Sequence, residues 1–312
     1  MKKEYFFWSL KLLVFIVLFF VFDLGMGYIL RSMQKRALEN NPEGMYAENA
    51  MWKVNSDVVL IGASEAHHAY IPSIIQDGLG LSCYNCGADG NFFYYQNAEI
   101  NVMLDRYSPR LIIWSVNPEF LSFDQKAFDR IGVLRPLSTN SAYCQNILRI
   151  QSKFEPIKNR LNMYSHNGKI LKYILFGYLQ GPRESILQGY KPLHNEDKKV
   201  NFLHLDYHTN ADSICKSLFV NTLKRCRDNN VQVVLVFTPQ FSEGDYTRSN
   251  SYCDLKNISV KMNIPLVEEL FHDSTIMSPK YFKDANHLND DGAEKFSSML
   301  SELMISMDLF SN

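Results

Sequence analysis

Hydrophobic residues form one long run near the N-terminus of this 312-residue chain and several short runs further along. The long run, residues 6–30, contains only two charged residues, Lys11 and Asp23, and both lie toward its ends. A helix needs about 20 apolar residues to cross a bilayer, and charged side chains near its ends can reach the headgroups. Residues 1–33 are therefore predicted to form a transmembrane signal anchor.

A cleaved signal peptide is the competing interpretation of this run. The run is not followed by a small-x-small cleavage site, and residues 25–27 are a poor substitute. Three lysines before or within the run are matched by Arg31, Lys35 and Arg36 after it, so the charges do not choose a side of the membrane.

The short apolar runs predict strands that are buried on both faces of a sheet. They occupy residues 57–62, 81–84, 111–116, 231–237 and 264–267. A helical pattern at 213–229 leads into the fourth run, and Asn289 or Asp290 can cap a C-terminal helix. Alternation of buried strands with helices predicts a three-layer αβα, flavodoxin-like fold with a parallel, doubly wound sheet.

Two other stretches lack such runs. Residues 34–55 are polar and are predicted to be a stalk or a first surface helix, followed by one domain over residues 56–312. Residues from about 120 to 210 show no buried strand and are rich in Tyr, Phe, Lys and Arg. This insertion is either a cap on the functional edge of the sheet or a helical layer without a ligand role.

Composition narrows the functional classes. With 32 basic and 33 acidic residues the net charge is -1, so nothing favours nucleic-acid binding. Six cysteines are too few for a disulfide scaffold, although Cys83 and Cys86 could form one bond. Ligand spacing for zinc is also absent, and we expect neither a metal nor a cofactor.

Ser64 is the first candidate for chemistry. It lies in Gly62-Ala-Ser64-Glu directly after the first predicted strand, where a strand-to-helix turn would expose its hydroxyl beside free backbone N–H groups. Such a serine can act as a nucleophile, and its own N–H can help to stabilise an oxyanion. The simpler alternative is a serine that only caps a turn.

A serine hydroxyl needs a base, and His287 is the leading candidate among eight histidines. It lies in Asp284-Ala-Asn-His287, where a carboxylate three residues away can orient the imidazole and stabilise its protonated form. A surface turn and helix cap would give the same pattern. His67 and His68 are alternative bases, or they line the rim of a pocket.

Two further residues could complete an oxyanion hole. Gly87 lies in the glycine-rich turn after the second strand, where its N–H could approach a substrate closely. This turn could instead cradle a phosphate, but it lacks the pattern of a dinucleotide site. Asn117 follows the third strand and could donate its amide, or it could simply start a turn before Pro118.

Taken in order, these segments resemble the SGNH/GDSL hydrolase family. Gly62-Ala-Ser64 is similar to its first block, Asn85-x-Gly87-x-x-Gly90 to its second, the stretch ending in Asn117 to its third, and Asp284-x-x-His287 to its fifth. The family's Gly-Asp-Ser-Leu is Gly-Ala-Ser-Glu here, and its Gly-x-Asn-Asp is Ser-Val-Asn-Pro. The resemblance implies Ser64, His287 and Asp284 as a catalytic triad, with Ser64, Gly87 and Asn117 as oxyanion donors.

The anchor followed by Gly-x-Ser-Glu is also similar to the membrane-anchored protein of lipoteichoic-acid D-alanylation and to accessory proteins of polysaccharide O-acetylation. That resemblance implies an extracytoplasmic catalytic domain and a partner membrane acyltransferase. We therefore expect a serine esterase or acyltransferase that acts on acyl esters, with acetyl as the first choice, of a cell-envelope glycan. The alternative is a catalytically silent module that binds glycan or scaffolds a membrane assembly.

Overall fold

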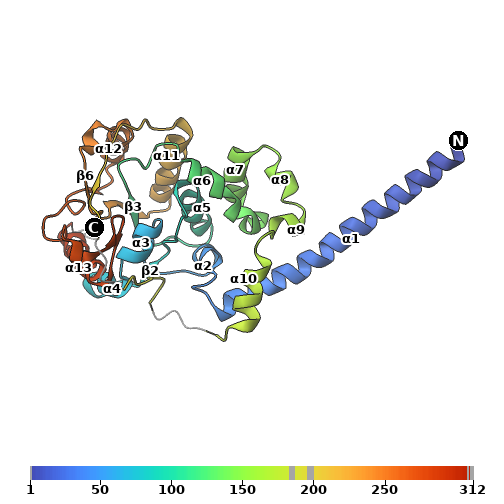
Figure 1. Cartoon of the computed structure of the whole chain (residues 1–312), viewed down its shortest axis with the longest axis horizontal. Helices are drawn as coiled ribbons and strands as arrows, with labels where there is room; N and C mark the ends of the chain where they lie inside the picture. The colour runs from blue at the N-terminus through green and yellow to red at the C-terminus, as the bar shows by residue number, and fades with distance from the viewer. Residues whose placement is uncertain (1, 183–186, 195–199, 308, 310–312) are drawn as a thin grey trace. The chain divides into compact units, whose positions relative to one another are not determined.

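The structure is a computed structural model that describes residues 2–182, 187–194, 200–307 and 309. The chain divides into two compact units. One contains residues 1–45 and 132–184, and the other contains residues 46–131 and 185–312. The elements of both can be followed along the chain in Figure 1.

A five-stranded parallel sheet forms the centre of the second unit. In spatial order its strands are β2 (Cys83–Asn85), β1 (Val58–Ile61), β3 (Leu111–Val116), β5 (Gln232–Phe237) and β7 (Leu266–Val267). Numbered among themselves along the chain, these strands have the order 2-1-3-4-5, which is the flavodoxin-like doubly wound order. The predicted fold class is confirmed, and each of the five predicted runs contributes a strand.

Helices cover both faces of this sheet. The side chains of Leu60 and Ile113 belong to a core shared with α3, α4 and α13. On the opposite face, Trp114 contacts Phe219 of α11 and donates a hydrogen bond from Nε1 to Gln96 of α5 at 2.8 Å. Because neighbouring residues of a strand point to opposite faces, runs without polar interruption such as 111–116 are what a sheet covered on both sides requires.

The helices of this unit have the following bounds: α2 Tyr46–Trp52, α3 Ser64–Ala69, α4 Pro72–Leu79, α5 Phe93–Leu104, α6 Gln125–Asp129, α11 Ser213–Asp228, α12 Asn250–Met262 and α13 Asp290–Ser306. Two small sheets accompany them. Strands β4 (Leu203–His204) and β6 (Ser242–Glu243) pair in parallel, and β8 (Phe282–Asp284) and β9 (His287–Leu288) form an antiparallel pair. Short 3₁₀ turns lie at Tyr246–Arg248 and Pro279–Tyr281, and a longer 3₁₀ helix, Arg130–Asn140, belongs mostly to the first unit.

Residues 34–55, predicted to be a stalk or a first surface helix, are largely helical. The first of these residues continue the N-terminal helix to Asn40, and Tyr46–Trp52 form α2, in which Ala47, Ala50 and Met51 are buried. These apolar side chains are too few and too widely interrupted to stand out in the sequence. They nevertheless give the helix one face that packs on α5.

The first unit is helical. Its N-terminal helix α1, Lys2–Asn40, is the long blue helix in Figure 1 and is long and apolar enough to be a candidate membrane span. The other elements are α7 (Ala142–Gln151), α8 (Glu155–Lys158), α9 (Asn162–Ser165), α10 (Ile170–Ile174) and a π-helical turn at Leu175–Leu179. These helices lie within the insertion predicted for residues 120–210, of which residues 183–186 and 195–199 are outside the described part.

All six cysteines lie in described residues and are free thiols. Cys83 is the first residue of β2 and Cys86 directly follows that strand; both are buried, and they are not bonded to each other. Burial raises the pKa of the Cys86 thiol well above its usual value, and the nearby Glu99 carboxyl adds to that effect. The Cys86 side chain therefore acts as a small apolar group in the core.

Candidate active site

Ser64 is positioned by the first strand of the sheet. All four residues of β1 are fully buried, the strand ends at Ile61, and Ser64 is the first residue of α3. A side chain at Gly62 would meet Ala66 Cβ at 2.5 Å and Ser115 Cβ at 2.8 Å, so only glycine fits this tight turn. The turn brings the Ser64 hydroxyl to the carboxyl edge of the sheet, where α/β proteins build their sites.

His287 and Asp284 are positioned by the β8–β9 hairpin. Asp284 pairs with His287 across this hairpin, and its Oδ1 accepts hydrogen bonds from the backbone N–H groups of Asn286 at 2.9 Å and His287 at 3.1 Å. Next along the chain, Asn289 caps α13 by accepting from the Gly292 N–H at 3.0 Å. The polar loop is therefore a fixed turn between a strand and a helix.

The three side chains form a continuous hydrogen-bonded chain. His287 Nε2 lies 2.8 Å from Ser64 Oγ, and His287 Nδ1 lies 2.8 Å and 3.0 Å from the two carboxylate oxygens of Asp284. Since the carboxylate can only accept, Nδ1 carries the hydrogen and Nε2 is free to accept the Ser64 proton. This is the geometry of a serine nucleophile, its base and the group that orients the base.

Replacing Asp284 by Asn is expected to lower kcat for a short-chain ester about 10³- to 10⁴-fold at neutral pH, with a much smaller change in KM. The amide keeps the shape but can hold His287 in the wrong tautomer, and it does not stabilise the imidazolium. Steady-state turnover of p-nitrophenyl acetate measures this, with Asp291→Asn on the surface of α13 as the matched control. A loss smaller than about threefold would show that Asp284 does not orient the base.

The three predicted oxyanion donors differ in whether they already donate a hydrogen bond within the protein. Within the described chain, neither the Ser64 N–H nor the Asn117 Nδ2 has a protein acceptor, and Asn117 Oδ1 accepts from the Glu119 N–H at 2.9 Å. By contrast, the Gly87 N–H donates to Asn85 Oδ1 at 2.8 Å. The oxyanion roles stay predictions, and that of Gly87 requires this hydrogen bond to be shared or given up.

Asn85 has a structural role that the sequence did not reveal. Its Nδ2 donates to the carbonyl oxygens of Ala66 and Tyr70, both at 2.8 Å, and so joins the end of β2 to α3. A side chain at Gly87 would meet the His67 backbone N at 2.6 Å, so this glycine lets the turn pass close to the same helix. Both residues hold the helix that carries Ser64.

His67 and His68 do not contact Ser64 as a base does. His67 Nδ1 and His68 Nε2 each lie 2.9 Å from Asp89 Oδ1, and Lys191 Nζ lies 2.8 Å from Asp89 Oδ2. Burial would raise the pKa of Asp89, but hydrogen bonds from these three side chains hold that pKa well below its usual range. The His68 ring also meets the His287 ring edge-on, with 5.6 Å between centroids.

This cluster could in principle hold a metal ion, because the ligand atoms of His67, His68 and Asp89 lie within 4.8 Å of one another. The Lys191 ammonium, however, already balances the carboxylate charge and would repel a cation. We therefore assign the cluster a structural role beside His287. Lys191 lies 102 residues from Asp89, and its neighbouring sequence carries no motif that predicts the contact.

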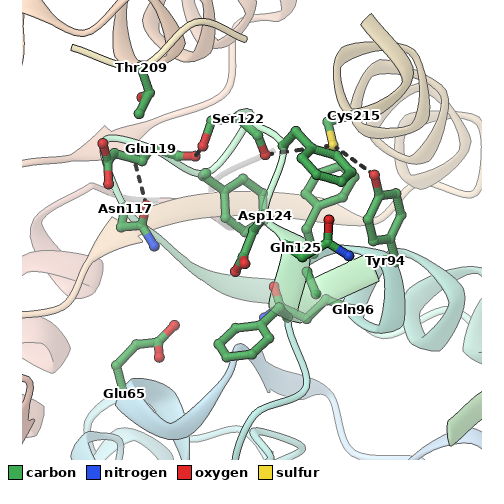
Figure 2. Close-up of a pocket in the computed structure, with 15 residues that line it drawn as sticks. Glu65, Tyr94, Gln96, Asn117, Glu119, Ser122, Asp124, Gln125, Thr209 and Cys215 are labelled. Atoms are coloured by element: carbon green, nitrogen blue, oxygen red, sulfur yellow. Dashed lines mark hydrogen bonds between the residues drawn. The ribbon is translucent and has the colours of Figure 1, made fainter. Parts of the chain in front are cut away.

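A cavity of about 340 Å³ is lined by the neighbour of Ser64 in the chain, Glu65, and by the oxyanion candidate Asn117. Figure 2 shows Glu65, the residue after Ser64, on one side and Asn117 and Glu119 on another. Burial raises the pKa of Glu65, although the backbone N–H groups of Glu65 and Ala63 oppose the shift. The other residues that line the cavity are mainly aromatic and polar. They include Phe92, Phe93, Tyr94, Phe120, Phe123 and Asp124.

Comparison with known proteins found no matching family model and no matching curated protein. Among solved structures, the chain is similar to a Bacteroides fragilis protein assigned as an acylhydrolase, with 12% identity, a TM-score of 0.43, and coverage of 85% of this chain and 95% of the other. It is also similar to a lipase/acylhydrolase from Enterococcus faecalis, with 11% identity, a TM-score of 0.40, and coverage of 80% and 95%. Likeness at this level leaves the function to be argued from the site itself.

Proposed function

We propose that the protein is a serine ester hydrolase or acyltransferase that uses Ser64, His287 and Asp284. The observation that carries this proposal is the unbroken chain from Ser64 Oγ through His287 to Asp284, with contacts of 2.8 Å on both sides of the imidazole. A silent binding module has no need for that alignment. Such a module, which the sequence left open, is the alternative that the experiments below can reveal.

The reaction follows from the geometry. Ser64 Oγ attacks the carbonyl carbon of an ester while His287 Nε2 takes the hydroxyl proton. The carbonyl oxygen gains negative charge, which the Ser64 N–H and the Asn117 amide can stabilise. Collapse of this intermediate breaks the bond to the leaving alcohol, which receives the proton from His287, and the acyl group stays on Ser64.

A second alcohol or water then completes the cycle. It gives its proton to His287 and attacks the carbonyl carbon of the acylated Ser64. The acyl–Oγ bond then breaks, Ser64 Oγ takes the proton back from His287, and either a carboxylic acid or a new ester is released. Water as the acceptor makes the protein an esterase, and a sugar hydroxyl makes it a transferase. Measuring free acid against acyl-sugar product from one donor ester separates the two activities.

A sugar substrate is supported by the cavity that Glu65 and Asn117 line. Its aromatic residues offer flat apolar faces for pyranose rings, and Glu65, Glu119 and Asp124 offer carboxylates that accept hydrogen bonds from hydroxyl groups. A cell-envelope glycan carrying acetyl groups fits this lining together with the candidate span α1. We further propose that α1 anchors the protein with its catalytic unit outside the cytoplasm, near a membrane acyltransferase.

Replacing Phe123 by Ala tests the sugar assignment. Phe123 lines the cavity and is half exposed, so its loss should leave the fold intact. We expect KM for an acetylated oligosaccharide to rise about tenfold, because one ring-stacking contact is lost, with a smaller effect on p-nitrophenyl acetate. Val260→Ala, at an exposed apolar position on α12, serves as the control. Equal changes for both substrates would argue against a sugar in this cavity.

A further inference from the structure

The helical segment of the first unit carries an excess of positive charge that has no part in the reaction proposed at Ser64. Residues 132–182 contain seven basic residues and one acidic residue, a net charge of +6, which leaves -7 for the remainder of a chain whose net charge is -1. The one acid, Glu155, already contacts Arg135 at 3.0 Å and Lys158 at 2.8 Å. Glu155 is the only carboxylate between residues 132 and 182, so positive charge predominates along this segment.

Three of these cations line one cavity. Arg149, Lys153 and Arg160 surround a space of about 470 Å³ together with Ser138, Gln145 and Asn159. Among described residues, none of the three cations forms an ion pair with a carboxylate, and Arg149 Nη1 only contacts Asn146 Oδ1 at 2.7 Å. The cavity therefore combines three positive charges with hydroxyl and amide groups, which is the chemistry that binds a phosphate.

Asn159 has a buried side-chain acceptor without a partner among the described residues. The residue is only 6% exposed and lines the cavity, yet its Oδ1 is buried without a hydrogen-bond partner in the described part of the chain. Its Nδ2 is already engaged, donating to the Arg135 carbonyl oxygen at 2.9 Å. A buried acceptor without a partner costs free energy, and a hydroxyl group on a bound ligand would supply the missing donor.

The same unit contains the candidate span. Residues 3–22 of α1 are all exposed, and these 20 residues make a helix about 30 Å long, the thickness of a bilayer's hydrocarbon core. Burial starts at Asp23, which is 3% exposed and accepts from the Asn162 N–H at 2.9 Å and the Met163 N–H at 3.0 Å. The helical segment thus joins α1 directly where its exposed apolar stretch ends.

Exposed apolar side chains lie beside the cationic cavity. Ile157, a lining residue, is 61% exposed, and Phe154, next to Lys153, is 55% exposed. Apolar groups between cations are typical of protein surfaces that rest at the headgroup level of a bilayer. A free phosphate ion would not cover these two side chains.

We propose that this cavity binds the phosphate of an anionic lipid headgroup at the surface of the bilayer that α1 enters. Arg149, Lys153 and Arg160 hold the phosphate, Asn159 accepts from a headgroup hydroxyl, and Phe154 and Ile157 contact the acyl boundary. The segment thereby fixes the first unit against the membrane. This inference does not depend on the reaction at Ser64.

The test is lipid binding to the full chain in detergent micelles, followed by native mass spectrometry with dioctanoyl phosphatidylglycerol and with dioctanoyl phosphatidylcholine. We expect preferential binding of the glycerol lipid. The combined change Arg149→Gln, Lys153→Gln and Arg160→Gln should weaken it at least about tenfold. The charge-matched control Lys53→Gln, Lys224→Gln and Lys261→Gln, at exposed positions of the second unit, should leave it unchanged within twofold.

Three results would overturn the proposal. Equal affinity for the two lipids would show that the anionic charge is not recognised, and an unchanged affinity of the cavity variant would place the lipid elsewhere. Inorganic phosphate that displaces the lipid at a comparable concentration would identify a free phosphate as the ligand. Fluorophosphonate labelling of Ser64 in the same preparations tests the proposed reaction separately, and either labelling result leaves the lipid-binding result unchanged.

Discussion

Ser64→Ala is expected to lower kcat/KM for p-nitrophenyl acetate about 10⁴- to 10⁶-fold, to the level that the remaining binding groups alone can sustain. Without the hydroxyl no acyl-enzyme can form, so the two-step path through Ser64 is closed. The alanine should not disturb the fold, because the Gly62 turn and the Asn85 hydrogen bonds that hold α3 do not involve the Ser64 side chain.

The control for this variant is Ser298→Ala, which removes a hydroxyl on α13 that only contacts the Glu294 carbonyl oxygen. Its turnover and melting temperature should match those of the wild type. If Ser64→Ala melts normally and keeps more than about a tenth of the activity, another group is the nucleophile and the proposed mechanism is wrong.

His287→Ala should cause a loss of the same order, about 10⁴- to 10⁶-fold, and combining it with Ser64→Ala should cost little more than either change alone. The reason is that the two side chains act as one unit, since a serine without a base is as inactive as a base without a serine. Single-turnover measurements of acylation would locate the loss in the step that Ser64 and His287 share.

His67→Ala is the informative comparison, because the sequence also allowed His67 or His68 as the base. His67 contacts Asp89 and not Ser64, so its removal should reduce turnover far less than that of His287. A larger loss from His67→Ala than from His287→Ala would reverse the assignment of the base.

The sheet, and the residues Ser64, His287 and Asp284 that it brings into one hydrogen-bonded chain, could be predicted because their signals are local. Each buried strand is a short apolar run bounded by polar or glycine residues, and the placement of Ser64 follows from the strand that precedes it. Asp284 and His287 lie three residues apart in one turn. Only the contact between Ser64 and His287, which are 223 residues apart, could not be predicted from local sequence. The parallel sheet brings the segments that carry the two residues together.

The features that the sequence did not predict depend on contacts between distant segments. The Asp89–Lys191 ion pair joins residues on either side of the long helical segment, and nothing near either residue marks its partner. The burial of α2 depends on α5, which has its own irregular apolar pattern. The cationic cavity gathers Arg149, Lys153 and Arg160 from separate turns, so their shared surface emerges only on folding.

Fluorophosphonate labelling of the full chain in detergent measures whether His287 activates Ser64. We expect stoichiometric labelling of the wild type at Ser64, with none in Ser64→Ala and a rate reduced by at least about a thousandfold in His287→Ala. A well-folded wild type that does not react would show that Ser64 is not activated and would favour a silent binding or scaffolding module.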